Sequence, residues 1–356
     1  MLHCVFSHTH LCWFMRHQTK LFRFQFVPRG IFWCASGLVF VAAVVWMGMN
    51  SSFDGLAILE EGKNTTAGAD ESIVTKRRAK TGEDSHVAPD GFSPETLPRY
   101  LESEYSDISW LVTHNSMSNR ADGWWFPNQS YGITRQLDDG VRGLMLDVHM
   151  IDGQPFLVHG ASVLGAMTLE SGLIQVKAFM QRQSNAIITL ILESYAPAHK
   201  VQEAFDVVGL SGMVHQQQTG SSWPKVGDMI ARGKRLVVFT DSGGGEWQGY
   251  HDVWNFCQET HYSVKQVEDF SFQRNRGEEA NSLLILNHFL THPIAGLGLA
   301  GQANAPDVLK TRLEECEKAT KCFPNFVAVD FYECGDTPNL LFEFNRQQAE
   351  KQKAEP

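Results

Sequence analysis

The chain has 356 residues, with 30 basic side chains (Lys and Arg) against 40 acidic ones, which gives a formal net charge of −10. The first 53 residues contain four basic and no acidic side chains, so the rest carries 26 basic and 40 acidic ones. A body this acidic is poorly suited to a polyanion, and we expect no nucleic acid partner. The 43% of apolar and 11% of aromatic residues exclude an intrinsically disordered chain.

A transmembrane anchor is predicted near the N-terminus. Residues 30–49 form a stretch without any charge, and a helix of that length covers the roughly 30 Å of a bilayer core. Four basic residues precede this stretch and acidic residues follow it. The positive-inside rule therefore predicts a cytoplasmic basic tail over residues 1–29 and a body in the lumen or outside the cell. The alternatives are a signal peptide, whose cleavage leaves a secreted protein, and a mitochondrial presequence.

The next segment, residues 50–97, is polar and has no sustained apolar periodicity, which is typical of a flexible linker. Two glycosylation sequons become usable in a lumenal body, at Asn64 and at Asn128. The body also contains an even number of cysteines, as disulfides require. They are Cys257, Cys316, Cys322 and Cys334. The second and third are near enough in sequence for a small disulfide loop, and free buried thiols are the alternative.

From residue 98 to 350, short apolar runs alternate with longer amphipathic segments. The predicted strands are Ile108–Val112, Gly143–Val148, Pro155–Val158, Ala186–Leu192, Arg235–Thr240, Leu283–Asn287 and Phe326–Asp330. The predicted helices are Leu169–Gln183, Ala198–Val208, Val226–Ala231 and Ala305–Lys318. Apolar strands separated by helices are typical of a parallel sheet with both faces covered. We therefore expect an α/β domain with a closed TIM-type (β/α)8 barrel, and an open doubly wound sheet is the alternative.

Polar side chains follow most of the predicted strands, at the point where the apolar run stops. These positions hold Thr113, His114, Asn115, Ser116, Asp147, His149, His159, Glu193, Asp241 and Asp330. In a barrel they share the rim at the carboxyl ends of the strands, where barrel enzymes place catalysis. One polar residue at a strand end is usually a cap or a loop contact. So many of them favour a shared functional site.

The order and spacing of these segments resemble a known family. Residues 113–116, 136–147 and 157–160 resemble the X region of phosphatidylinositol-specific phospholipase C (PI-PLC). Residues 233–241 and 324–332 resemble the PLC-like phosphodiesterases that contain only this X-type domain. The resemblance implies a TIM-like barrel that cleaves a phosphodiester, with an inositol phospholipid or a related phosphodiester as substrate. No second catalytic or C2-like segment is visible, so regulation through additional domains is not implied.

The resemblance also implies which residues carry the reaction. It makes His114 the general base and His159 the general acid, with Asp330 as the carboxylate that orients His114. Imidazole titrates near pH 6.5, so one histidine can take a proton from the attacking hydroxyl while another gives one to the leaving group. A carboxylate paired with the first imidazole would hold its tautomer and stabilise its charged form.

The residues expected to neutralise the charge of the phosphate differ from those of the family. The resemblance implies a site for Ca²⁺ or another divalent cation at Asn115, Asp147 and Glu193, but Met145 stands where the eukaryotic enzymes have a further acidic ligand. The bacterial enzymes instead place an arginine where this chain has His149. We expect His149 and Asp241 to contact the substrate, whereas Arg142 has the character of a structural barrel residue.

Two other functions are alternatives. One is a catalytically impaired barrel that binds a phosphorylated headgroup or a glycan without turnover, which the replacement by Met145 suggests. The other is a phosphodiesterase with a different substrate, such as a glycerophosphodiester or sphingomyelin. The aromatic run Trp124–Phe126 could be a lip that dips into lipid, but packing against the barrel is the favoured interpretation. Gly243–Gly245 suggests a mobile loop at the rim.

Overall fold

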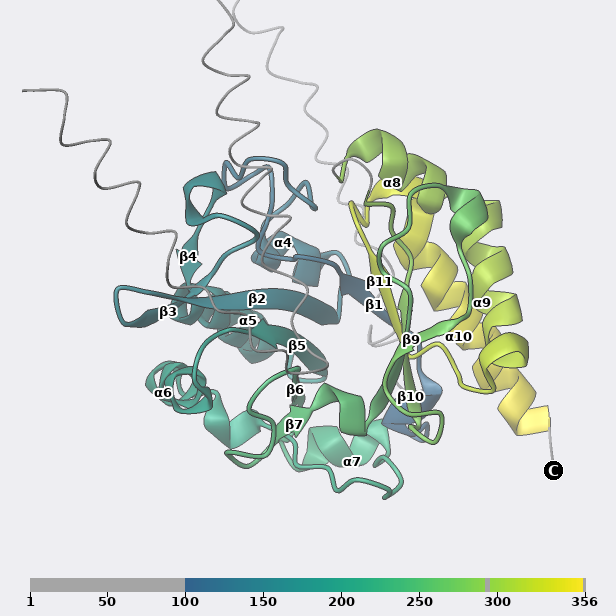
Figure 1. Cartoon of the computed structure of the whole chain (residues 1–356). Helices are drawn as coiled ribbons and strands as arrows, with labels where there is room; N and C mark the ends of the chain where they lie inside the picture. Colours follow the sequence, from purple (N-terminus) through teal and green to yellow (C-terminus); the bar gives the residue numbers. More distant parts are fainter. Residues whose placement is uncertain (1–99, 292–294, 355–356) are drawn as a thin grey trace, which may run out of the picture. The chain divides into compact units, whose positions relative to one another are not determined.

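The computed structural model of the protein describes residues 100–291 and 295–354 (Figure 1). The predicted basic tail, the predicted span over residues 30–49 and the linker lie outside these residues, as does Asn64. Within the described part of the chain, no helix is both long and apolar enough to cross a bilayer.

The central feature is a curled parallel sheet. Eight strands run parallel in the order β7-β6-β5-β2-β1-β11-β10-β8, which is their chain order around a barrel. Their bounds are β1 Trp110–Thr113, β2 Gly143–Ile151, β5 Ile188–Ser194, β6 Leu236–Thr240, β7 Tyr250–Asp252, β8 Cys257–Thr260, β10 Leu283–Asn287 and β11 Phe326–Val329. The α/β class, the parallel direction and the barrel-like strand order are thus as predicted.

The predicted closure of the barrel is wrong. In the described residues no ladder joins β7 to β8, so the sheet is an open curl with a seam between these two strands. The connection explains the seam. Only residues 253–256, which include the short 3₁₀ helix Val253–Asn255, lie between the two strands. Two paired parallel strands need a crossover of a dozen or more residues, so these neighbours in sequence cannot pair in parallel.

Short antiparallel strands extend the sheet at two places. The predicted strand Pro155–Val158 is β3, Gln154–Leu157. It forms an antiparallel hairpin with β2 and is not one of the parallel strands of the curl. It pairs in turn with β4, Met167–Thr168. On the other side β9, Arg274–Arg276, pairs antiparallel with β8. The sequence analysis did not predict β4, β7, β8 or β9, because each is short and, apart from β8, not continuously buried.

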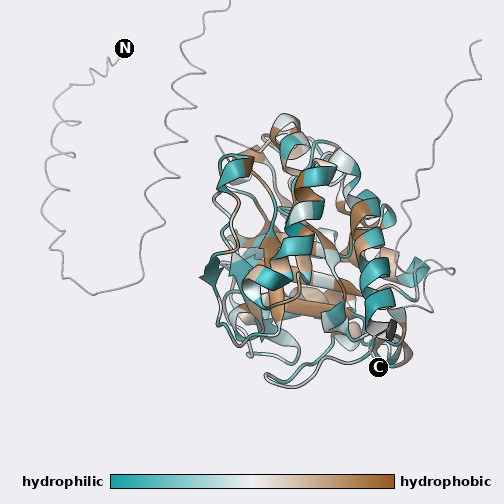
Figure 2. Ribbon diagram, turned by 90° about the vertical axis from the view of Figure 1, so that its right-hand side faces the viewer, coloured by the Kyte–Doolittle hydropathy of each residue, from teal (hydrophilic) through white to brown (hydrophobic). Residues whose placement is uncertain are grey.

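Helices cover the outer face of the curl (Figures 1 and 2). The four predicted helices are present as α5 Leu169–Arg182, α6 Ala198–Val208, α7 Val226–Ala231 and α9 Pro306–Thr320. The structure adds α4 Ile133–Asp138, α8 Leu297–Ala303 and α10 Thr337–Ala354. The start of α5 illustrates the local cause. The hydroxyl of Thr168 accepts a hydrogen bond from the backbone N–H of Ser171 at 3.2 Å and so satisfies one free donor of the first turn.

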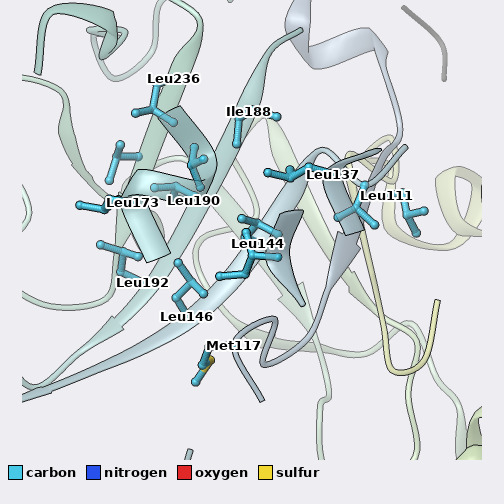
Figure 3. Close-up of a cluster of buried hydrophobic side chains, with 14 of the residues drawn as sticks. Leu111, Met117, Leu137, Leu144, Leu146, Leu173, Ile188, Leu190, Leu192 and Leu236 are labelled. Atoms are coloured by element: carbon cyan, nitrogen blue, oxygen red, sulfur yellow. The ribbon is translucent and has the colours of Figure 1, made fainter. Parts of the chain in front are cut away.

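The strands alternate their side chains between two apolar clusters. On the outer face, Leu144 and Leu190 pack with Leu173 of α5 in the layer shown in Figure 3. On the concave face, Val112 and Phe239 belong to a second cluster that also contains Trp110, Trp223, Ile285 and Phe326. Because successive side chains of a strand point to opposite faces of the sheet, this alternation determines which side chains at the end of each strand point to the concave face.

Of the two alternatives for the cysteines of the body, disulfides or free thiols, the structure has free thiols. The four cysteines of the body are free thiols, and three of them are buried. The Sγ atom of Cys322 lies 3.6 Å from the carbonyl oxygen of Ser282, so it faces the backbone before β10. Burial raises the pKa of Cys316 to about 12 and that of Cys322 to about 11, which keeps both thiols protonated at neutral pH.

Candidate active site

The polar residues of the rim lie on the concave side of the sheet. In β2 and β5 the register pairs Asp147 with Glu193 directly across two neighbouring strands. His114 and Asp330 follow β1 and β11 at positions that continue the concave alternation of Val112 and Ala328. The alternation therefore brings side chains from four strands, β1, β2, β5 and β11, to one face.

His114 and Asp330 form the best-defined pair of the site. The Nδ1 atom of His114 lies 2.9 Å from Oδ1 of Asp330, and the two side chains are 20% and 3% exposed. On the other side of the ring, Nδ2 of Asn115 lies 3.1 Å from Nε2 of His114. A proton on Nδ1 that is donated to the carboxylate leaves Nε2 as an acceptor, which is the tautomer a general base requires.

The imidazole of His114 is also held in its plane. The ring of Phe289, which follows β10, stacks on it with centroids 3.8 Å apart and planes 4° apart. The backbone after both members of the pair is in the left-handed region, with φ +46° at Asn115 and +44° at Phe331. Non-glycine residues rarely adopt this conformation outside sites where the surrounding structure enforces it.

His159 follows the hairpin strand β3. Burial and, to a smaller extent, the charge of His114 together lower its pKa to about 4. The charge of His114 thus acts on His159, although the two residues are 45 positions apart in sequence. In the free protein at pH 7 the imidazole of His159 is therefore neutral.

Three carboxylates gather at the ends of β2, β5 and β6. Burial raises the pKa of Asp147 well above its usual range, and the charges of Glu193 and Asp241 raise it further. Burial also raises the pKa of Asp241, although its Oδ1 accepts a hydrogen bond of 2.8 Å from the backbone N–H of Ser194. This side of the rim is rich in negative charge and would repel a phosphate without a cation.

The residues predicted to bind a metal do not form a complete ligand set in this arrangement. The amide of Asn115 points its Nδ2 at His114, and Glu193 accepts a hydrogen bond from the hydroxyl of Tyr195. In the described residues no group of three or more His, Cys, Asp or Glu side chains is arranged to hold a metal ion. Met145 adds no oxygen ligand at its position.

His149 lies on the outward part of β2 and stacks on Tyr195 with ring centroids 4.4 Å apart. Burial lowers the pKa of His149, and the charge of Glu193 partly counters this effect. His149 is thus associated with the carboxylate of Glu193 on β5. Asp241, the other predicted substrate contact, lies beside the same carboxylates.

The sequence analysis missed an arginine at the rim. Arg276 on β9 donates from Nε and Nη2 to the carboxylate of Glu259 on β8, at 2.7 and 2.8 Å. Its guanidinium also lies over the ring of Trp254 at 4.2 Å. Burial raises the pKa of Asp241, and the positive charge of Arg276 partly counters this rise. The short strands β8 and β9 are polar apart from Cys257, so the sequence carried little signal for either of them.

The aromatic run after β1 divides into two parts. Trp124 is buried against Gly165, where any Cβ would overlap its ring, so packing is right for this residue. Trp125 is 67% exposed and Phe126 is also exposed, so the prediction that the aromatic run packs against the barrel is wrong for these two residues. The backbone N–H of Trp125 donates to the carbonyl of Leu164 at 2.8 Å, next to the exposed Val163 in the loop after His159. An apolar surface therefore borders the catalytic candidates.

Comparisons with known proteins agree on one family. The model of the family described as PI-PLC X 1 matches residues 100–345. A PI-PLC X domain-containing protein of Arabidopsis thaliana is 29% identical over 252 residues, which cover 64% of this chain and 58% of that protein. PI-PLC X domain-containing protein 1 of Arthroderma benhamiae is 26% identical over 260 residues, which cover 67% of this chain and 85% of that protein. The chain thus spans less than two thirds of the Arabidopsis relative.

Solved structures with low sequence identity also match. The phosphatidylinositol-specific phospholipase C of Listeria monocytogenes has a TM-score of 0.48 at 14% identity, covering 69% of this chain and 95% of that one. A phosphatidylinositol-specific phospholipase C of Staphylococcus aureus has a TM-score of 0.48 at 12% identity, covering 68% of this chain and 94% of that one.

Proposed function

The chain belongs to the PI-PLC X-domain family, and from this premise we propose that it is a phosphoric diester hydrolase in which His114 and His159 act as base and acid. The observation that carries the proposal is the bond of 2.9 Å between His114 Nδ1 and Asp330 Oδ1, with Nε2 left as an acceptor and His159 close by. We further propose that the substrate is an inositol phospholipid or a related phosphodiester.

The proposed reaction proceeds in line at phosphorus. Nε2 of His114 takes the proton of the attacking hydroxyl, which in an inositol lipid is the ring hydroxyl next to the phosphate. The new P–O bond forms, the bond to the lipid oxygen breaks, and His159 gives its proton to that oxygen. The product is a cyclic phosphate, and water opens it with the roles of the histidines exchanged.

Substrate binding has to protonate His159 for this scheme. Its pKa of about 4 in the free protein leaves the imidazole neutral at pH 7. A phosphodiester carries a negative charge, and a nearby negative charge raises the pKa of a histidine. The bound substrate therefore raises the pKa of His159 and favours its protonated form, which is the form a general acid needs. Asp330 stabilises the imidazolium that forms on His114 during the reaction.

The charge on the phosphate needs a further partner. We propose Arg276 for this role, because its side chain is 42% exposed while Glu259 fixes its orientation. A divalent cation at Asn115, Asp147 and Glu193 is a separate proposal, since it would relieve the repulsion between the carboxylates. No step of the reaction above depends on it.

A lipid substrate is supported by the apolar surface beside the site. Trp125, Phe126 and Val163 are exposed on the loops that follow β1 and His159. Exposed aromatic and aliphatic side chains at a rim suit contact with a membrane surface. We propose that the body works at such a surface on the lumenal or extracellular side, held there by the N-terminal segment.

The experiment that tests this function incubates the full chain with phosphatidylinositol vesicles, with Ca²⁺ or with chelator, and follows phosphorus NMR. We expect a cyclic inositol phosphate from the wild type. We expect H114A and H159A to reduce turnover by at least about 1,000-fold while the thermal unfolding transition is retained. Equal turnover by wild type and either variant would sink the two-histidine mechanism. Binding of inositol phosphate without any product would favour the alternative of an impaired barrel.

A further inference from the structure

Asn128 and Gln129 lie directly behind the His114–Asp330 pair. Nδ2 of Asn128 donates to Oδ1 of Asp330 at 3.1 Å, the same oxygen that His114 contacts. Nε2 of Gln129 donates to the backbone carbonyls of His114 at 2.8 Å and Val329 at 3.1 Å. The first side chain thus holds the carboxylate, and the second holds the ends of the two strands that carry the pair.

Asn128 supplies a large share of the hydrogen bonding of Asp330. In the described residues, Oδ2 of Asp330 is buried and has no partner, so His114 and Asn128 are the side chains that donate to this carboxylate. Asn128 itself is 2% exposed, which excludes bulk water as a substitute for its amide. A buried carboxylate with so few donors depends strongly on each of them.

The backbone of Asn128 stabilises the same place. Its carbonyl accepts a hydrogen bond of 2.9 Å from the N–H of Phe331, the residue that follows Asp330 and has φ +44°. A bulky residue in the left-handed region persists only where its surroundings hold it. Asn128 therefore contacts Asp330 through its side chain and the strained residue beyond it through its backbone.

We propose that Asn128 is a positioning residue for the catalytic pair, which fixes the carboxylate of Asp330 so that His114 keeps its proton on Nδ1 and presents Nε2 to the substrate. This inference rests on the proposed function. It also gives the tripeptide Asn128–Ser130 a role other than the predicted glycosylation sequon. A glycan on Asn128 would replace one of the two amide protons of a side chain that donates to Asp330, and the buried position leaves no space for it.

The test compares three substitutions in the full chain. N128A removes the amide, N128D replaces it with an isosteric acceptor, and S130A destroys the sequon but leaves Asn128 in place. We expect N128A to lower kcat by about 10- to 100-fold with KM changed less than threefold, as removal of a supporting hydrogen bond does. We expect S130A to retain wild-type kinetics and to differ from the wild type in mass by the substitution alone, because no glycan is lost.

The pH dependence of kcat in N128D distinguishes a positioning role from a merely structural one. At neutral pH its carboxylate faces Asp330 and His114, and the like charge disturbs the pair. When that acid is protonated it can donate to Asp330 as the amide does. The ratio of N128D to wild-type kcat should therefore rise as the pH falls. A folded N128A or N128D with wild-type kcat, or a ratio that does not change with pH, would overturn the proposal.

A second measurement separates this inference from the proposed function. A proton shared between His114 Nδ1 and a buried carboxylate exchanges slowly with solvent and is visible by proton NMR. We expect this resonance in the wild type and in S130A, and its loss or rapid exchange in N128A. Inactive wild-type protein that shows this pattern would refute the reaction but retain the positioning role. An unchanged resonance in N128A would refute the positioning role whatever the activity.

Discussion

The two sides of the curled sheet are built differently. Between β1 and β11 the ladder is continuous over four residue pairs, from Trp110–Phe326 to Thr113–Val329. Between β7 and β8 no ladder forms in the described residues, and four residues connect the strands directly. The base and its carboxylate lie on the continuous side, whereas Arg276 lies on the hairpin β8–β9 at the seam. Parallel pairing positions the candidate catalytic groups, and the seam supplies a charged group from a less constrained element.

The largest expected effect comes from breaking the pair on the continuous side. We expect D330N to lower kcat by at least about 100-fold with little change in KM, because the amide can no longer stabilise the imidazolium of His114 or hold its tautomer. The measurement is initial-rate kinetics on phosphatidylinositol vesicles. Ser109, a buried residue near the opposite end of β1, offers a control, since S109A removes a hydrogen bond of 2.5 Å to Pro324 without touching the pair. Comparable kcat losses in both variants would show that general destabilisation explains the effect.

The second prediction concerns stability at the seam as the pH changes. His251 on β7 has its pKa lowered to about 4, mainly by burial, while an unfolded histidine titrates near 6.5. Between these values the unfolded chain binds a proton that the folded chain does not. The stability that neutral His251 contributes is therefore present above pH 6.5 and is lost as the pH falls to about 4. We expect a decrease in the free energy of unfolding on the order of 2–3 kcal/mol from pH 7 to 4.5.

Urea denaturation at several pH values checks this expectation. His159 and His288 also have lowered pKa values, of about 4 and about 3, and the raised pKa values of Asp147 and Asp241 act in the opposite direction, so the total change differs from the share of His251. The variant H251N isolates that share, because it cannot titrate and should flatten the pH dependence by the stated amount. The same slope in H251N and the wild type would contradict the assignment.

The smallest expected effect comes from the seam side of the site. We expect R276Q to raise KM about tenfold, with kcat reduced by less than that, if its guanidinium binds the phosphate but takes no part in proton transfer. R276K should recover part of the loss because it keeps the charge but not the bidentate bond to Glu259. Arg274 lies on the same strand and R274Q serves as the matched control. A loss confined to kcat would assign Arg276 to the reaction in place of binding.

Period-two alternation explains why much of the site was predictable. Four site residues follow or end apolar strands, and the sequence indicated the direction of these strands and the face on which the side chains lie. They are His114, Asp147, Glu193 and Asp330. Their gathering on the concave face follows from the parallel direction alone. Arg276 was not predictable in this way, because it lies on β9, a short polar strand that pairs with β8.

The sequence analysis was also wrong about residues whose role depends on partners far away in the chain. Asn128 reads as a glycosylation sequon, and only its burial against Asp330, 202 positions away, gives it another role. Trp124 and Trp125 are identical neighbours in sequence, yet one packs on Gly165 and the other is exposed. No property of the run itself distinguishes them.

The amino-acid sequence by itself determined the α/β class, the helices α5, α6, α7 and α9 and the parallel direction of the main strands. These follow from periodicity, which is local. The choice of His114, His159 and Asp330 as candidate catalytic residues came from the resemblance to the PI-PLC X region. Tertiary structure alone decided that the sheet stays open between β7 and β8, that Asp330 meets both His114 and Asn128, and that Arg276 reaches the rim. Each of these depends on contacts between segments far apart in the chain or on the length of a connection, which the pattern within one segment does not contain.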